Sequence, residues 1–119
     1  MGDLRQLAAS FPEDPDINLS LVMVLVNETR DTPSQTRDVV DELRPVVERF
    51  PDHAEINGGL AKALFNLTLM EPESVEAITE ELETLADRFP DDLGISNVYA
   101  MTLVNQTLTE PEHIQLIID

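Results

Sequence analysis

The chain has 119 residues, no cysteine, and 24 acidic against 7 basic side chains, which gives a formal net charge of −17 at pH 7. This length fits a single domain over residues 1–119, the lack of cysteine excludes disulfides and thiolate zinc sites, and the negative charge disfavours nucleic-acid partners. The first ten residues lack the apolar core of a signal peptide, and the apolar run 19–26 is much shorter than a membrane-spanning helix. We therefore expect a cytoplasmic protein with no membrane partner.

The acidic residues are spread along the whole chain instead of being gathered in one tail, and Lys62 is the single lysine. This distribution resembles that of proteins from salt-loving microbes, whose surfaces stay hydrated in concentrated salt. We favour a halophilic interpretation over an acidic patch that recruits a basic partner.

Three copies of one pattern follow each other without a gap at a spacing of 39 residues, over about 4–42, 43–81 and 82–119. Eight positions are identical in all three copies, and two of these positions form an Asn-x-Thr triplet at Asn27, Asn66 and Asn105. A period between 20 and 50 residues is typical of solenoids and propellers, in which each unit buries its apolar side against its neighbours.

The first predicted element is the second half of an amphipathic helix, with Leu4, Leu7 and Phe11 on one side. The next, 17–27, contains LVMVLVN, which by itself is typical of a strand. Its counterparts LAKALFN and YAMTLVN occupy the same positions in the later copies and include good helix formers. We therefore predict helices over 17–27, 56–70 and 95–109, with N-caps at Asp14, Asp52, and Asp91 or Asp92. Their predicted core-facing residues are Ile17, Leu21, Val24, Leu25, Ile56, Leu60, Ala63, Leu64, Ile95, Tyr99 and Leu103.

Between these segments, 36–50 and 75–89 each carry an apolar stripe at helical spacing and end before a proline. Pro45 lies inside the first of these helices and should kink or split it near Asp41. The segments 17–27, 56–70 and 95–109 contain no acid, and Lys62 is their only base. We therefore expect these uncharged helices to form an inner layer and the acidic helices to face water.

The last element, around Ile114, Ile117 and Ile118, reads as the first half of a further helix. The two half helices at the ends of the chain are complementary. Either the chain belongs to a longer array, or the ends of separate molecules dock on each other, which would give a homo-oligomer. The predicted self-association residues are Leu4, Leu7, Phe11, Ile114, Ile117 and Ile118.

Helix pairs closed by proline, followed by an acidic turn and by a small residue ten positions later (Ala61 after Pro51, Ala100 after Pro90), resemble tetratricopeptide repeats. The usual period of that family is about 34 residues, and a HEAT-like or armadillo-like pair is the alternative. In either case the expected fold is all-α, a right-handed α-α superhelix (solenoid) of three 39-residue helix-turn-helix repeats with half helices at both ends.

The tetratricopeptide resemblance implies a non-catalytic module whose inner groove binds a peptide or a segment of a partner protein. Carried over by position, the groove residues are Met23, Val26, Asn27, Lys62, Phe65, Asn66, Met101, Val104 and Asn105. A ladder of three amides would suit an extended peptide, since each amide both donates and accepts hydrogen bonds. The same asparagines could instead bridge adjacent repeats, and the methionines could be packing residues.

No pattern indicates a catalytic, metal or cofactor site. His53 and His113 fall at different positions of the repeat and in no ligand spacing, and acidic pairs such as Asp91 and Asp92 are better explained as turns and caps. The Asn-x-Thr triplets match a glycosylation acceptor, but their recurrence every 39 residues favours a structural role.

Overall fold

The computed structural model of the chain describes residues 2–109, and within this range all regular structure is helical. The elements are α1 (Gly2–Ser10), α2 (Pro15–Asp31), α3 (Thr36–Arg49), α4 (Ala54–Met70), α5 (Val75–Arg88) and α6 (Leu93–Thr109), with short 3₁₀ turns Pro33–Gln35 (η1) and Pro72–Ser74 (η2). The all-α prediction is confirmed. Residues 21–26, which by themselves are typical of a strand, lie in the middle of α2, so the helix predicted there is confirmed.

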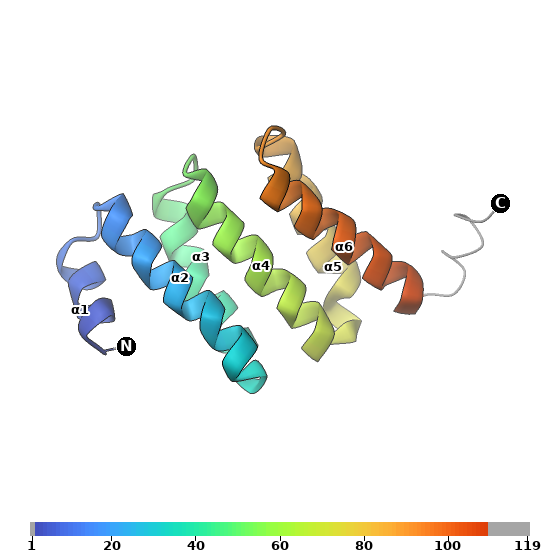
Figure 1. Cartoon of the computed structure of the whole chain (residues 1–119), viewed down its shortest axis with the longest axis horizontal. Helices are drawn as coiled ribbons and strands as arrows, with labels where there is room; N and C mark the ends of the chain where they lie inside the picture. The colour runs from blue at the N-terminus through green and yellow to red at the C-terminus, as the bar shows by residue number, and fades with distance from the viewer. Residues whose placement is uncertain (1, 110–119) are drawn as a thin grey trace.

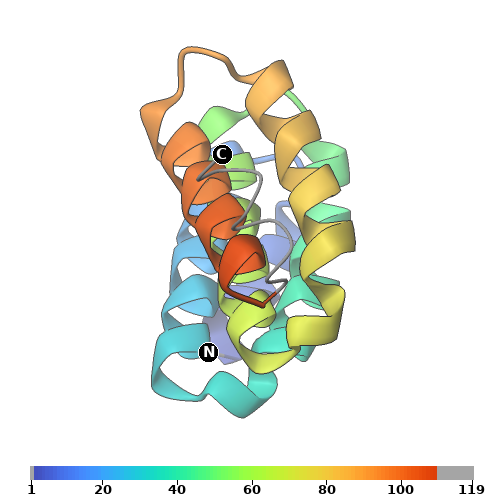
Figure 2. The same cartoon turned by 90° about the vertical axis from the view of Figure 1, so that its right-hand side faces the viewer.

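The helices form two layers (Figures 1 and 2). One contains α2, α4 and α6 side by side, which we call the inner layer, and α3 and α5 lie behind it. Helix α4 is central, since it contacts α2 and α6 in its own layer and α3 and α5 in the other. Helix α1 packs against α2 at one end.

One cluster of buried apolar side chains joins the two layers, and most of the predicted core lies in it. The prediction that Val24 and Leu103 face the core is wrong, because their side chains are 37% and 39% exposed. Helix α2 instead turns Val22 and Val26 toward its neighbours, and α6 buries Val98 in addition to the predicted Ile95. Since α4 has a neighbour on each side, it buries more of its circumference than α2 or α6 does. The predicted core residues that are buried are Leu21, Leu25, Ile56, Leu60, Ala63, Leu64 and Ile95.

Equivalent positions, 39 residues apart, cap the three inner helices. Asp14 Oδ1 accepts the Ile17 amide at 3.1 Å, and Asp92 Oδ1 accepts the amide of Ile95 at 3.0 Å, so these two cap predictions are confirmed. The cap of α4 is His53, whose Nδ1 accepts from a backbone amide at 3.3 Å. The prediction of Asp52 is therefore wrong by one residue.

Helix α3 continues from Thr36 to Arg49 with Pro45 inside it, so the proline does not split the helix. Proline removes the backbone hydrogen bond to the carbonyl of Asp41. Both residues are exposed, and water can therefore solvate the freed carbonyl. No helix among residues 2–109 is long and apolar enough to cross a membrane.

Candidate functional site

The inner layer contains a cleft of about 310 Å³ between α2, α4 and the start of α6. Two adjacent glycines of α4, Gly58 and Gly59, line this cleft. A Cβ atom at Gly59 would overlap the Val22 side chain, so α2 and α4 approach closely there, and Gly58 lies near Ile95 of α6. The lining residues are Leu19, Val22, Met23, Val26, Asn27, Ala54, Glu55, Gly58, Gly59, Lys62, Asp92, Gly94 and Ile95.

Four of the nine sequence-predicted groove residues meet at this cleft: Met23, Val26, Asn27 and Lys62. Met23 is 59% exposed and presents an apolar surface, whereas Val26 is buried. Lys62 is exposed and makes no ion pair or hydrogen bond with any residue between 2 and 109. The cleft therefore combines an apolar wall with one cation that is available to a ligand.

The other five predicted groove residues lie outside the cleft. Phe65 is half-buried and packs on the core, while Met101 and Val104 are exposed on α6. The remaining two, Asn66 and Asn105, are half-buried and take part in contacts between helices.

Two asparagines of the recurring triplet bridge neighbouring inner helices. Asn66 Nδ2 donates to Thr29 Oγ1 at 2.7 Å, joining α4 to α2, and Asn105 Nδ2 donates to Thr68 Oγ1 at 3.0 Å, joining α6 to α4. The structure thus shows the bridging role that the sequence left open for these two amides. The threonines were not predicted as functional residues, although their recurrence two positions after each asparagine was a usable signal.

Acidic side chains gather on the other layer, where ion pairs link successive helices. Arg5 of α1 pairs with Glu42 of α3 at 2.7 Å, and Arg44 of α3 pairs with Glu81 of α5 at 2.7 Å, one sequence period later for both partners. Each arginine uses two nitrogens, and the hydrogen bonds to glutamate raise the arginine pKa. Such partly exposed pairs contribute little to stability. They favour the packing of each helix against one particular neighbour.

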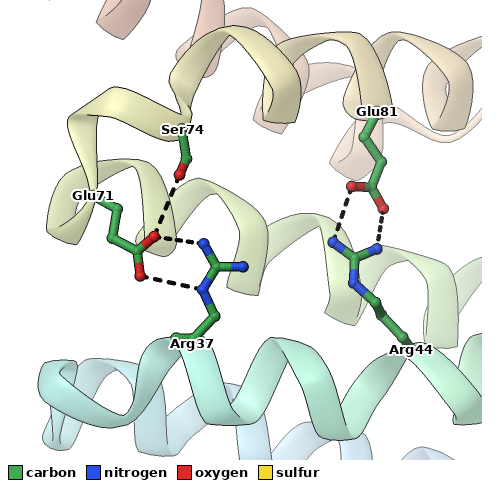
Figure 3. Close-up of polar contacts among 5 residues, drawn as sticks. All are labelled: Arg37, Arg44, Glu71, Ser74 and Glu81. Carbon is green, nitrogen blue, oxygen red and sulfur yellow. Dashed lines mark hydrogen bonds and ion pairs between the residues drawn. The ribbon is translucent and has the colours of Figure 1, made fainter.

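A third ion pair lies at the end of α4 (Figure 3). Arg37 of α3 holds the carboxylate of Glu71 with two nitrogens, and the Ser74 hydroxyl donates to the same carboxylate. The hydrogen bond from Arg37 lowers the pKa of Glu71. This pair ties the turn between α4 and α5 to α3.

The predicted self-association residues are only partly described. Leu4 is half-buried against the core, and Leu7 and Phe11 of α1 are 47% and 53% exposed. The other three, Ile114, Ile117 and Ile118, lie outside the described residues.

Within residues 2–109 no group of three or more His, Asp or Glu side chains is arranged to hold a metal ion. His53 serves as a helix cap, and Asp92 combines a cap with a place in the wall of the cleft. No protein-family model, curated protein or solved structure matches the chain.

Proposed function

We propose that the protein is a non-catalytic interaction module that binds a peptide or a segment of a partner protein in the cleft of the inner layer. The observation that carries this proposal is the cleft itself, an open space of about 310 Å³ on the layer whose central segments contain no acid. Clefts of this size with a mainly apolar wall and a few polar groups are the usual form of a binding site.

The cleft chemistry favours an extended segment over a charged small molecule. An apolar side chain of the partner would pack on Met23, and the Lys62 ammonium and Asn27 amide would donate to its backbone carbonyls. Glu55 and Asp92, which line the cleft, disfavour a strongly acidic partner, as does the net charge of −17.

The architecture that supports this function is, in our proposal, an α-solenoid of three 39-residue repeats, similar to tetratricopeptide arrays or to the HEAT-like alternative. Contacts that recur at this spacing support it: the Asn66 to Thr29 bond has its equivalent from Asn105 to Thr68, and the helix caps recur likewise. Small-angle X-ray scattering curves that fit a compact, nearly spherical helix bundle instead of an elongated array would contradict it.

Matched methionine substitutions test the binding proposal. Peptides are selected from a random displayed library on the wild-type chain, and their affinities are measured for Met23→Glu and Met70→Glu. Both methionines are exposed and both changes add one negative charge, but Met70 lies at the end of α4, outside the cleft. We expect Met23→Glu to weaken binding by about fivefold to a hundredfold, because burying the new carboxylate at an apolar contact costs on the order of 1–3 kcal/mol.

Equal losses in the Met23 and Met70 variants, or failure to select any peptide, would contradict binding in the cleft. Met101→Glu then reports how far the groove extends over α6. A loss with this variant supports the full set of groove residues predicted from the sequence.

We also propose that the acidic surface is an adaptation to concentrated salt in a cytoplasmic protein. Since like charges destabilise a compact chain, added potassium chloride should raise the urea midpoint of unfolding. An unchanged midpoint between dilute buffer and molar salt would contradict this.

The second candidate function is self-assembly, favoured by the exposed Leu7 and Phe11 on α1. In this candidate α1 of one molecule covers apolar surface of another. Glutamate at both positions should reduce the weight-average mass measured by light scattering in molar salt, and a wild-type chain that stays monomeric at every concentration would contradict it.

A further inference from the structure

Two hydrogen bonds of the same kind join neighbouring helices of the inner layer, and paired residues are 37 positions apart in both. In each, an asparagine amide donates to a threonine of the preceding inner helix. The hydroxyls of Thr29 and Thr68 donate their own proton to the carbonyl three residues earlier, both at 2.6 Å. Each threonine oxygen is therefore fixed as an acceptor for the incoming amide.

The same two groups recur on the first and last helices of the inner layer, where no partner for them is found among the side chains that the structure describes. Asn27 is exposed on α2, where it also borders the cleft, and its counterpart Asn66 reaches the preceding inner helix; the Asn27 amide makes no hydrogen bond to the described side chains. Thr107 on α6 donates to the Val104 carbonyl at 2.7 Å, as the other two threonines do to theirs, and its oxygen receives no described donor. We call the contact between two neighbouring inner helices, with its Asn-to-Thr hydrogen bond, a joint. The α2 edge thus offers the asparagine donor of such a joint, and the α6 edge offers the threonine acceptor.

The packing residues of the joint recur at the same edges. Inside the chain Gly59 lies against Val22, and one period later the equivalent positions are Val98 and Ala61, which are buried. A small residue is thus present at both joints, as close helix approach requires. The equivalent positions on the open edges are Ser20 of α2 and Ala100 of α6, and both are small and exposed.

Apolar surface borders both edges. Val24 is exposed on α2 and Val104 is 59% exposed on α6, while 17–27 and 93–109 contain no acidic residue. These edges can therefore approach each other without burying a carboxylate, despite the strong negative charge of the chain.

We propose that the α2 edge of one molecule docks on the α6 edge of a second copy of this chain, with Asn27 of one donating to Thr107 of the other. The occupant is a second copy because the contact continues an interface that the chain already makes twice. The two edges differ, so the contact is head-to-tail and propagates into rings or filaments. This inference rests on the self-assembly candidate for its occupant and names the surfaces involved.

The register of this contact also predicts its weak point. If the docked molecule continues the repeat, Glu83 occupies the position one period after Arg44. Asp3 of the docked molecule then occupies the position one period after Glu81, which is the partner of Arg44 inside the chain. Two carboxylates repel at this position, so association should be weak in dilute buffer and stronger in molar salt. Glu83→Arg should restore the attractive pair.

The test is sedimentation velocity of the full chain in molar potassium chloride over a range of concentrations. Glu83→Arg should raise the association constant about three- to fivefold over Glu48→Arg, which makes the same charge change on α3, away from both edges. Thr107→Val should lower it about fivefold. Thr84→Val is its control, since Thr84 also donates to a backbone carbonyl, but it lies on the side of α5 that faces α3, beside Arg44 and Glu48 and away from the docking edge.

Circular dichroism of every variant checks that the helices remain folded. The inference is overturned if the wild-type chain and Glu83→Arg are both monomeric throughout, or if each variant behaves as its control does. Association that responds to Leu7→Glu and Phe11→Glu but not to Thr107→Val also overturns it, while leaving the self-assembly candidate standing.

Discussion

The hydrogen bond from Asn66 to Thr29 distinguishes a structural role of the recurring asparagines from a ligand-binding role. Thr29 is buried and Asn66 half-buried, and the bond length is 2.7 Å. In Asn66→Ala the threonine keeps its bond to the Val26 carbonyl, so no polar group loses every partner. The expected cost is therefore that of one net hydrogen bond, about 1 kcal/mol of the free energy of unfolding.

A double-mutant cycle with Thr29→Val isolates the pair, because the coupling energy removes the effect of the lost side-chain volume. Urea unfolding followed by far-UV circular dichroism in molar salt measures it. A loss of about 1 kcal/mol lowers the midpoint by roughly 0.5 M. The pair Asn105 and Thr68 should give a similar coupling, whereas Asn27→Ala should change stability by less than about 0.5 kcal/mol. Coupling near zero, or equal losses in Asn66→Ala and Asn27→Ala, would refute the bridging role.

Three further predictions follow from the helix termini and the packing of α4. His53→Asp should raise the free energy of unfolding by about 0.5–1 kcal/mol, because aspartate is the better N-cap at this backbone geometry. Thermal unfolding measures this change, and a lowered midpoint would contradict the prediction. Gly59→Ala should destabilise by about 1–2 kcal/mol through overlap with α2, whereas Gly58→Ala, which has room for a Cβ, should stabilise; the same sign in both urea midpoints would contradict the packing. Arg37 lowers the pKa of Glu71 in the folded state, so its stabilising effect is present above the ordinary glutamate pKa of about 4.3 and is lost as pH falls further. The stability difference between wild type and Arg37→Gln should therefore shrink between pH 7 and pH 3, and a difference that grows would contradict this.

The helices were predictable because the three sequence copies constrain one another. LVMVLVN alone favours a strand, but its later counterparts contain good helix formers, and α2 is helical. The helix ends were predictable to within a few residues from prolines and capping carboxylates. The exception, His53, has the wrong residue type for the expected pattern but the right position in it, 39 residues after Asp14.

The burial pattern was less predictable, because it depends on which helices lie on each side. Val24 and Ala63 occupy equivalent positions, yet Val24 is exposed at an edge and Ala63 is buried in the central helix. A periodic pattern assigns both to the same environment, whereas the number of neighbouring helices decides their exposure.

Only part of the candidate site was predictable from the sequence. Met23 and Lys62 were expected in the groove from the resemblance to tetratricopeptide repeats, and both line the cleft, whereas five of the nine expected residues lie outside it. The bonds of Asn66 to α2 were only one of two options in the sequence, since a distance between helices cannot be read from spacing. The contribution of Glu55 and Asp92 to the cleft depends on how α4 and α6 approach each other, which the sequence does not specify.

The most direct test of partner binding by the inner layer is a nuclear magnetic resonance titration of the labelled chain with a library-selected peptide. We predict that amide shifts change along α2, along the first half of α4 and at the start of α6, around Met23 and Lys62. Changes confined to α3 and α5, or no changes with a peptide that binds, would contradict the proposal.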